Sequence, residues 1–366
     1  MIQCQIKLKL TKIQKRKLDQ YLWTLTGIYN WAIRKVKLNA KDNIYFSKND
    51  FQNILPGCSK KIEIPSHVIQ GTLSTVYTAW QRCFKKIAKE PKLKGVRNKL
   101  NSIPFPDPIK NPTNFKIRLP GLNEVRFHKQ DIPEGKIKCG RILKKASGWY
   151  LCLFIDASPN PIPRISNNKI GIDPGFNHLI TTSSGEKIDH PRELEKSQKR
   201  LGQAQRGKNK KLTARIHERI SNQRRDRNHK LSRRLITENS FIAFSKDNIR
   251  GIANKFGKSV SSSGHGQLRQ MLKSKSSYCG ANYVEVNSRN STKSCCVCGS
   301  LTGPSGLSDL AVRVWVCEVC GISHDKDINS AVNTLITWLG ESPETLRESG
   351  LKLYTDSLVG VVRLSV

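Results

Sequence analysis

Two pairs of cysteines near the end of the chain have the type and spacing of a metal site. They form the pattern C-x2-C-x18-C-x2-C, and a glycine follows each pair. The four cysteines are Cys295, Cys298, Cys317 and Cys320. This spacing is typical of a ribbon in which two tight knuckles hold one Zn2+ tetrahedrally by its thiolates. An iron–sulfur centre or a redox-active thiol pair is the alternative chemistry.

Acidic side chains follow the cysteine pattern directly. Asp325, Asp327 and Asn329 alternate where a helix is expected to begin, and carboxylates there could hold a divalent cation. Asp173 ends a predicted strand much earlier in the chain. An α/β sheet can bring Asp173 beside Asp327, and two such carboxylates can share metal ions for in-line attack on a phosphodiester. A lone aspartate at a strand end is more often a turn residue, so this pairing needs support from its surroundings.

The charge of the chain indicates a polyanionic partner. Its 366 residues include 64 Lys and Arg against 28 Asp and Glu, which gives a formal net charge of +36. Solubility requires far less positive charge than this, and nucleic acid is the natural partner. A generally supercharged surface or a ribosomal-type protein would also explain the charge, but neither explains the acidic motifs.

The sequence lacks the signals that would direct the chain to a membrane or out of the cell. No apolar run approaches the roughly 20 residues that span a bilayer, and the first residues, MIQCQIKLKLTKIQ, contain no apolar signal-peptide core. We therefore expect a cytoplasmic protein with no membrane partner. The seven cysteines outside the two pairs show no pairing order, which fits buried or spare thiols in a reducing compartment. Cys296, inside the first knuckle, is the only one of them that could replace a ligand.

The first half of the chain alternates between strand and helix patterns. Residues 2–10 alternate apolar and polar side chains as in a strand, and Thr11 then caps a helical pattern. A basic, mostly helical stretch continues to residue 111 and includes a helix over 65–89, and strand patterns return between 114 and 157. This order predicts a small β-barrel interrupted by an inserted helical lobe.

The second half begins with a buried strand at residue 169 that ends on Asp173. Two helices between residues 192 and 234 carry 16 Lys or Arg against 4 Asp or Glu, and this imbalance favours nucleic-acid-binding faces over ordinary solvated ones. The strand SFIAFS, a helix near residues 267–275 and the strand NYVEVN complete an α/β pattern. The candidates for contact with a nucleic-acid backbone are Arg224, Arg225, Arg227, Lys230, Arg233 and Arg234.

The order of several motifs resembles one protein family. GIDPGFNHLITTSSG is followed by NQRRDRNHKLS, the apolar strand SFIAFS, the cysteine ribbon and HDKDINSAVN. This order is similar to the RuvC nuclease half of TnpB, the OrfB-type, transposon-encoded RNA-guided DNA endonucleases regarded as ancestors of the type V CRISPR effector nucleases. IQCQIKLKLT and GKIKCGRILKKASGWYLCLFID also resemble the N-terminal wedge domain of that family, so the resemblance covers nearly the whole chain.

The resemblance implies an α/β plus β-barrel architecture. An RNase H-like RuvC domain with an inserted zinc ribbon would be preceded by a wedge β-barrel that carries a helical recognition insert. The implied parts are the wedge (1–10 and 113–160), the helical lobe (11–112), the RuvC domain (169–290 and 321–340), the ribbon (291–320) and a tail (341–366). The resemblance also implies structural Zn2+, catalytic Mg2+, and a guide RNA that reads the target DNA by base pairing.

The catalytic carboxylates implied by the resemblance are incomplete. Asp173 matches the first catalytic aspartate and Asp327 the last, but Ser245 stands where the family has its middle glutamate. A neutral hydroxyl is a poor ligand for a hard divalent cation. The possible replacements are Asp247, two residues further along the same strand, and Glu285, between two valines in the next strand. We expect Glu285, because neighbouring strands lie about 4.8 Å apart, although a half-exposed strand would also explain a glutamate there.

Three functions are therefore open at the level of sequence. The favoured one is Mg2+-dependent DNA cleavage at a two-metal site built from Asp173, Glu285 and Asp327, with guide RNA and target DNA as partners. A nuclease-dead, RNA-guided DNA-binding protein that represses a locus would explain Ser245 better. An accessory transposition factor that acts without a guide would explain the charge but leaves the wedge-like N-terminus unused. The sequence leaves the oligomeric state open.

Overall fold

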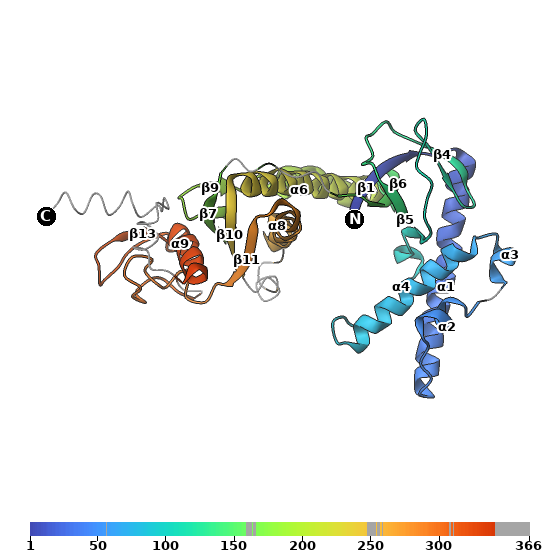
Figure 1. Cartoon of the computed structure of the whole chain (residues 1–366), viewed down its shortest axis with the longest axis horizontal. Coiled ribbons are helices and arrows are strands. Elements are labelled where there is room, and N and C mark those ends of the chain that lie inside the picture. The colour runs from blue at the N-terminus through green and yellow to red at the C-terminus, as the bar shows by residue number, and fades with distance from the viewer. Residues whose placement is uncertain are drawn as a thin grey trace. The chain divides into compact units, whose positions relative to one another are not determined.

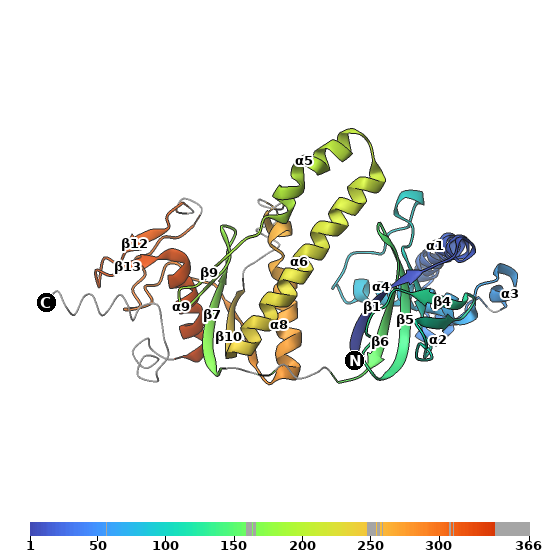
Figure 2. The same cartoon turned by 90° about the horizontal axis from the view of Figure 1, so that it is seen from above.

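The computed structural model describes residues 1–55, 57–158, 163, 166–246, 254, 257, 259–306, 309 and 311–340 of the chain. The chain divides into two compact units, Met1–Pro159 and Asn160–Val366 (Figures 1 and 2). The predicted tail (341–366) and Asp247 lie outside the described residues. Within the described ranges, no helix is long and apolar enough to cross a membrane.

The first unit is built on a six-stranded antiparallel sheet in the order β2-β5-β6-β1-β4-β3. Its strands are β1 (Ile2–Lys9), β2 (Ser102–Phe105), β3 (Lys116–Leu119), β4 (Asn123–Phe127), β5 (Lys136–Lys145) and β6 (Gly148–Asp156). The opening strand β1 is central, because it pairs with β6 on one side and β4 on the other. The predicted β-barrel is observed in part: β2 and β3 are the edges of an open sheet among the described strands. Each edge strand has only four residues, which leaves little backbone to close the sheet.

Helices join β1 to β2 and pack on this sheet. They are α1 (Lys12–Lys41), α2 (Lys48–Gln52), α3 (Cys58–Ile62), α4 (Ser66–Phe84) and the short 3-10 helix η1 (Val96–Asn98). α1 begins with a capping box, in which Thr11 and Gln14 each bond the other's backbone N–H through the side chain. Leu18, Leu22 and Leu25 lie at three- and four-residue spacing on its buried face and share one core with the sheet. β2 belongs to the sheet, although its residues fall within the predicted helical lobe.

The second unit contains a mixed five-stranded sheet in the order β11-β10-β7-β8-β9. Its strands are β7 (Asn168–Pro174), β8 (His178–Thr182), β9 (Lys187–Asp189), β10 (Asn239–Lys246) and β11 (Asn282–Asn287). β7, β8 and β9 are antiparallel neighbours, whereas β10 is parallel to β7 and β11 is parallel to β10. The strands that carry Asp173, Ser245 and Glu285 are therefore adjacent.

Helices cover both faces of this second sheet (Figure 2). They are α6 (Lys210–Glu238), α8 (His265–Cys279) and α9 (Lys326–Leu339). α5 (Glu193–Arg206) packs on α6, and the ribbon adds the antiparallel pair β12 (Val314–Val316) and β13 (Ser323–Asp325). Ile172 and Phe244 pack in one apolar cluster with side chains of α6 and α8. Ala243 and Val286 pack in another with side chains of α9. Alternation along the strands thus divides the sheet into an α6–α8 face and an α9 face.

Gly171 lets α9 pass very close to β7. A β-carbon at this position would lie 2.1 Å from the carbonyl oxygen of Ala331 and 2.9 Å from Cβ of Leu335. A glycine in a strand often marks such a close approach. Asp173 is two residues further along β7, so it points to the same face and lies beside α9.

Candidate functional site

The four ribbon cysteines converge on one point. Their sulfur atoms all lie within 4.8 Å of one another, with 3.6 Å between Cys298 and Cys317 and 3.7 Å between Cys295 and Cys320. A tetrahedral Zn2+ with Zn–S bonds of about 2.3 Å holds its sulfurs about 3.8 Å apart. The four cysteines therefore fit one zinc ion, and Cys296 is not part of the cluster.

Each knuckle of the ribbon is a tight backbone turn. The Gly299 N–H donates to the Cys295 carbonyl at 2.9 Å, and the Gly321 N–H donates to the Cys317 carbonyl at 2.8 Å. The two glycines have φ angles of +79° and +70°, a region that strongly disfavours a β-carbon. The glycine after each cysteine pair is therefore required by the turn that aims the two sulfurs.

Hydroxyl groups favour the ionised form of one ligand. Ser300 Oγ lies 3.1 Å and Thr302 Oγ1 3.4 Å from the Cys317 sulfur. Burial opposes ionisation of Cys317, but hydrogen bonds from these hydroxyls and from backbone N–H groups outweigh it and lower its pKa to about 5. Zinc binds the thiolate form, so this environment suits a metal ligand better than a spare thiol.

Two asparagines of α9 hold the ribbon against the helix. Asn329 Oδ1 accepts the N–H of Cys296 at 2.9 Å, and its Nδ2 donates to the Ser294 carbonyl at 2.8 Å. Asn333 Nδ2 donates to the Ser294 carbonyl at 2.7 Å and to the Ser291 carbonyl at 2.8 Å. Asn329 is thus engaged with the first knuckle of the ribbon. The four-residue spacing of the asparagines was the sequence signal for this role.

Asp173 lies at the end of β7, against α9. Its Oδ1 accepts a hydrogen bond from Ser330 Oγ at 2.8 Å, and Ser291 Oγ lies 2.9 Å from the same Ser330 hydroxyl. Asp327 is one turn before Ser330 on α9, so the two side chains lie on the same side of the helix. The structure therefore brings Asp173 and Asp327 to one face of the sheet. Sequence reasoning missed Ser330, which orients Asp173.

Cations lie beside both of these carboxylates. Arg313 Nη1 is 3.5 Å from Asp327 Oδ1. Lys326 is buried, and its Nζ donates to the Asp309 carbonyl at 2.7 Å. Burial lowers the pKa of Lys326 most and Arg313 lowers it further, whereas the nearby carboxylates, Asp173 among them, oppose the change. Lys326 thus shares one electrostatic environment with the two catalytic candidates.

Asp325 has a structural role at the start of α9. Its Oδ1 accepts the N–H groups of Asp327 and Ile328, each at 3.1 Å, as an N-cap. Its Oδ2 pairs with Lys187 Nζ of β9 at 2.5 Å. Both carboxylate oxygens of Asp325 are therefore engaged within the protein.

Ser245 occupies the place beside Asp173 in the sheet. In the parallel pairing of β10 with β7, Phe244 lies opposite Ile172, and the next step along both strands puts Ser245 beside Asp173. The Ser245 side chain is buried, and within the described ranges its Oγ has no hydrogen-bond partner. An unpaired buried hydroxyl costs about 1–3 kcal/mol. The position next to Asp173 thus carries a neutral side chain that contributes nothing to the hydrogen bonding of the fold.

Glu285 lies on the other face of the sheet. β11 pairs with β10 so that Glu285 is opposite Phe244, and residues in register point to the same face. The Glu285 carboxylate pairs with Arg269 of α8, and the Tyr283 hydroxyl lies 3.4 Å from it. Burial opposes ionisation of Glu285, but the contacts with Arg269 outweigh it and lower the Glu285 pKa.

The predicted triad is therefore not assembled, because Glu285 faces α8 whereas Asp173 faces α9. In the part of the chain that the structure describes, the four cysteines are the only group of three or more His, Cys, Asp or Glu side chains close enough to share one ion. Among the described residues, Asp173 and Asp327 thus have no third carboxylate in such a group. Residue type and strand adjacency suggested Glu285, but strand register decides the face.

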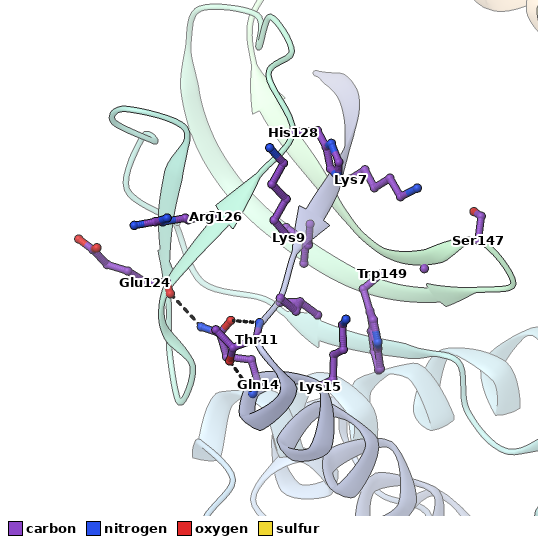
Figure 3. Close-up of a pocket in the computed structure, with 13 residues that line it drawn as sticks. Lys7, Lys9, Thr11, Gln14, Lys15, Glu124, Arg126, His128, Ser147 and Trp149 are labelled. Carbon is purple, nitrogen blue, oxygen red and sulfur yellow. Dashed lines mark hydrogen bonds between the residues drawn. The ribbon is translucent and has the colours of Figure 1, made fainter.

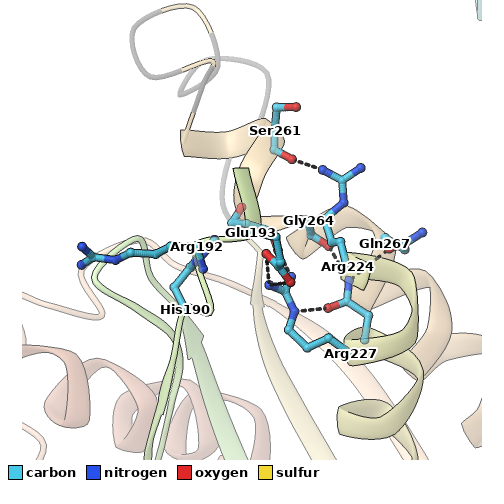
Figure 4. Close-up of polar contacts among 10 residues, drawn as sticks. His190, Arg192, Glu193, Arg224, Arg227, Ser261, Gly264 and Gln267 are labelled. Atoms are coloured by element: carbon cyan, nitrogen blue, oxygen red, sulfur yellow. Dashed lines mark hydrogen bonds and ion pairs between the residues drawn. The ribbon is translucent and has the colours of Figure 1, made fainter. Parts of the chain in front are cut away.

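Three of the six basic candidates on α6 are engaged within the protein. Arg227 pairs with Glu193 at 3.1 and 3.2 Å, donates to the Ser263 carbonyl at 2.6 Å and is only 14% exposed (Figure 4). It ties α6 to the start of α5, and it does not face solvent as a phosphate contact would. Arg224 donates to a backbone carbonyl, and Arg234 forms a two-nitrogen pair with the Glu186 carboxylate.

The other three basic candidates are exposed. Lys230 pairs with Asp226 one turn away at 2.7 Å, but its side chain is 77% exposed. Arg225 and Arg233 are also exposed, and neither forms an ion pair with another described residue. These three side chains remain available to an external partner.

Two family models match the chain, both from residue 154 onward. "Probable transposase" (OrfB_IS605) matches residues 154–254, and "Cas12f1-like, TNB domain" matches residues 265–334. The second range contains α8, β11, the cysteine ribbon and most of α9. The two matches thus span the elements that carry the cysteines and the candidate carboxylates.

Several curated proteins are similar over most of the chain. A Streptomyces pristinaespiralis protein named "Putative RNA-guided DNA endonuclease" is 30% identical over 300 residues, which cover 76% of this chain and 73% of that protein. InsQ of Escherichia coli (strain K12), described in the same words, is 24% identical over 74% of each chain. TnpB-like protein L79 of Acanthamoeba polyphaga mimivirus is 27% identical over 48% of this chain and 39% of its own.

Fold and site together define a protein with a Cys4 ribbon inserted into a mixed α/β sheet that carries paired aspartates. The extent of similarity to these relatives shows that the chain belongs to the TnpB family.

Solved structures align more loosely. The "Cryo-EM structure of the Cas12f1-sgRNA-target DNA complex" aligns with 92% of this chain and 99% of its own at 16% identity and a TM-score of 0.36. The "Cryo-EM structure of CRISPR-Cas12f Ternary Complex" aligns with 89% of this chain and 85% of its own at 14% identity and the same TM-score. A TM-score this low supports no inference about mechanism.

Proposed function

We propose that this protein is an RNA-guided DNA endonuclease of transposon origin, acting in the cytoplasm on DNA that a guide RNA selects. The observation that carries the proposal is the 30% identity across 73% of a relative named for this activity. The placement of Asp173 and Asp327 on one face of the sheet supports it, because paired carboxylates are what a metal-dependent phosphodiesterase needs.

The second unit is the proposed nuclease domain, of the RNase H-like RuvC type. Its strand order supports this assignment: an antiparallel meander β7–β8–β9 is followed by β10, which adds in parallel beside β7, and by β11, which adds in parallel beside β10. The proposed bounds are 169–290 and 321–340, with the ribbon at 291–320. The first unit is the proposed wedge (1–10 and 113–160) with its helical lobe (11–112).

The hard oxygen donors Asp173 and Asp327 fit Mg2+, and they would hold it. Bound there, Mg2+ would supply Lewis-acid activation of water and of the phosphodiester. Ser330 fixes the Asp173 carboxylate by its 2.8 Å hydrogen bond. Lys326, buried close by, contributes positive charge to the same place, which favours an approaching phosphate.

The cysteine cluster would hold Zn2+ as a structural ion. All four ligands are cysteines, and a closed set of this kind leaves no open position for a substrate. Asn329 and Asn333 join the first knuckle to α9. The ribbon would therefore stabilise the helix that carries Asp327.

Guide RNA and target DNA would contact the exposed cations of α6. Arg225, Lys230 and Arg233 are accessible, and backbone contacts of this kind carry no sequence information. Sequence would instead be read by pairing between guide and target. Copurification of RNA with the protein would distinguish this function from that of a transposition factor without a guide.

A second function is favoured by one observation. Ser245 places a neutral, buried side chain beside Asp173, and the predicted replacement Glu285 points to the opposite face. A protein with this site would bind guided DNA and leave it intact. The alternative is thus a nuclease-dead, RNA-guided DNA-binding protein that blocks a locus.

Cleavage of a matched plasmid with Mg2+ decides between the two functions. If the protein is an endonuclease, the wild type cuts, and Asp173→Ala lowers the rate by about a thousandfold, since loss of a metal ligand removes several kcal/mol of transition-state stabilisation. If it is a DNA-binding protein, the wild type binds the matched plasmid without cutting it. Ser245→Glu should then create cleavage, because it restores a carboxylate beside Asp173. Ser245→Gln, of similar size and without charge, is the matched control.

A further inference from the structure

A basic hollow lies in the first unit, where β1 runs into α1 (Figure 3). It has a volume of about 680 Å³ and is bounded by β1, β4, the first turn of α1 and the turn before β6. Its residues all precede residue 154, where the first of the two matched family ranges begins. The side chains that matter here are Lys7, Lys9, Lys15, Arg126, His128 and Trp149.

Two neighbouring strands place basic side chains opposite each other in this hollow. Lys9 of β1 is the register partner of Arg126 of β4, and the His128 N–H donates to the Lys7 carbonyl at 2.9 Å. The intervening pair, Leu8 and Phe127, points into the core, so the four basic residues share the outer face. Like charges directly opposite each other on a sheet are destabilising. The fold therefore carries a cost that an anion in the hollow would relieve.

The surrounding protein does not neutralise these cations. Glu124 is the only acidic residue that lines the hollow, and its carboxylate pairs with Lys116 at 3.2 Å. Lys7, Lys9 and Lys15 form no ion pair with any described residue. The acidic partner of this surface is thus expected from another molecule.

The first turn of α1 makes the hollow suitable for a phosphate group. The first turn of α1 contains no acidic residue and adds the positive end of a 30-residue helix. Figure 3 shows Lys15 rising from this turn beside the indole of Trp149, with Lys9 above them. The indole of Trp149 is buried and already has Lys144 Nζ over it, 5.2 Å from the ring centroid, so the cations of the hollow are the groups that would contact a phosphate.

We propose that this hollow binds phosphates of a nucleic-acid backbone. The inference rests on the proposed function, since it takes guide RNA or target DNA as the partner, and it assigns to the first unit a contact distinct from the exposed cations of α6. RNA and DNA present the same phosphodiester to the hollow, so the experiment uses both.

The test compares two double variants of the full-length chain that remove the same charge. Lys9→Gln/Lys15→Gln empties the hollow of two cations, whereas Lys37→Gln/Lys138→Gln removes two lysines that already pair with Glu90 and Asp156. Binding of a single-stranded RNA and of a DNA of the same sequence is measured by fluorescence anisotropy over a series of KCl concentrations. Asp173→Ala in every background prevents cleavage from entering the measurement.

The hollow variant should lose about tenfold in affinity, and the slope of log K against log salt should fall by about 1.4, or about 0.7 for each lost contact on a single strand. The paired-lysine control should change far less. Loss of affinity for RNA alone would show that the hollow binds the guide RNA. Loss of affinity for both polymers would show that it accepts the backbone of RNA and of DNA.

Equal losses in the two double variants, or no loss in the hollow variant, would overturn the proposal and leave the proposed function standing. Failure of the wild type to bind either polymer would instead count against the proposed function itself. Thermal unfolding supplies an independent readout. Lys9→Gln should leave Tm unchanged or raise it, because it removes the repulsion with Arg126, and a lower Tm would show that Lys9 serves the fold.

Discussion

The two faces of the sheet in the second unit are built for different purposes. The α6–α8 face is apolar, with Ile172 and Phe244 packed against the two helices. The α9 face instead has Gly171, Asp173 and Ser245, small or polar residues over which α9 and the ribbon lie. The first face supplies mainly apolar burial, whereas the second adds a close helix approach and polar groups to the apolar contacts of Ala243 and Val286 with α9.

The difference shows that the face on which a residue falls is as important as its strand. Glu285 lies on the strand next to Ser245, yet its register partner is Phe244, which points to the apolar face. Arg269 of α8 forms an ion pair with Glu285 on that face. Because its side chain points to the face opposite Asp173, Glu285 takes part in a structural ion pair although it lies on the expected strand.

The largest effect is expected where the α9 face meets the ribbon. Cys317→Ser removes one of four thiolates, and structural zinc sites of this type contribute on the order of 10 kcal/mol to folding. We expect loss of bound zinc, measured by elemental analysis of the purified protein, and a large fall in Tm. Cys296→Ser is the matched control: its sulfur lies outside the cluster, so the zinc content should be kept. Full zinc retention in Cys317→Ser would contradict the ligand assignment.

Gly171→Ala tests how closely α9 approaches the sheet. The added β-carbon would lie 2.1 Å from the Ala331 carbonyl oxygen, a backbone atom that cannot move without shifting α9. We expect the free energy of unfolding to fall by about 3 kcal/mol or more, the upper range for overpacking. Urea denaturation measures this. Gly202→Ala in α5 is the control of opposite sign, because its nearest neighbour is the flexible end of Arg206 at 3.4 Å and alanine favours a helix by about 1 kcal/mol.

On the α6–α8 face, one buried histidine should make the stability of the second unit depend on pH. His265, the first residue of α8, donates from its Nε2–H to the Leu179 carbonyl at 2.8 Å and is almost fully buried. Burial lowers its pKa to about 4, and the charges of His190 and Arg227 act in the same direction. Its folded pKa is thus below its unfolded value of about 6.5, so the unfolded state binds the proton more readily.

The contribution of neutral His265 to the free energy of unfolding is fully present above about pH 6.5. As the pH falls toward 4, the free energy of unfolding decreases by about 3 kcal/mol. Urea denaturation at a series of pH values measures the loss. His265→Asn should flatten the curve in this window, whereas His217→Asn, at an exposed position, should not. If His265→Asn leaves the dependence of the unfolding free energy on pH unchanged, His265 is not the group responsible.

Local spacing and long-range register differ in what they reveal from sequence. The Cys4 cluster was predictable because each knuckle is fixed within a few residues by its own glycine turn. Asp173 and Asp327 could be paired because the order of elements implied it. The orientation of Glu285 depends on strand pairing over many residues, and Ser330 gains its role only once α9 is docked, so neither carried a signal in its own neighbourhood.

Glu285→Gln gives the smallest effect and sharpens the contrast between the faces most directly. The ion pair with Arg269 is mostly shielded from solvent, with side chains 24% and 18% exposed. Glutamine keeps the size but leaves the Arg269 charge without its partner, so we expect a loss of about 1–2 kcal/mol in urea denaturation. The rate of any Mg2+-dependent cleavage, per folded molecule, should not change, since Glu285 faces away from Asp173. A selective loss of cleavage with normal stability would instead place Glu285 in the nuclease site. Replacing both partners, as Glu285→Gln with Arg269→Gln, should recover part of the lost stability and still leave cleavage unchanged, because removing both charges leaves neither without a partner.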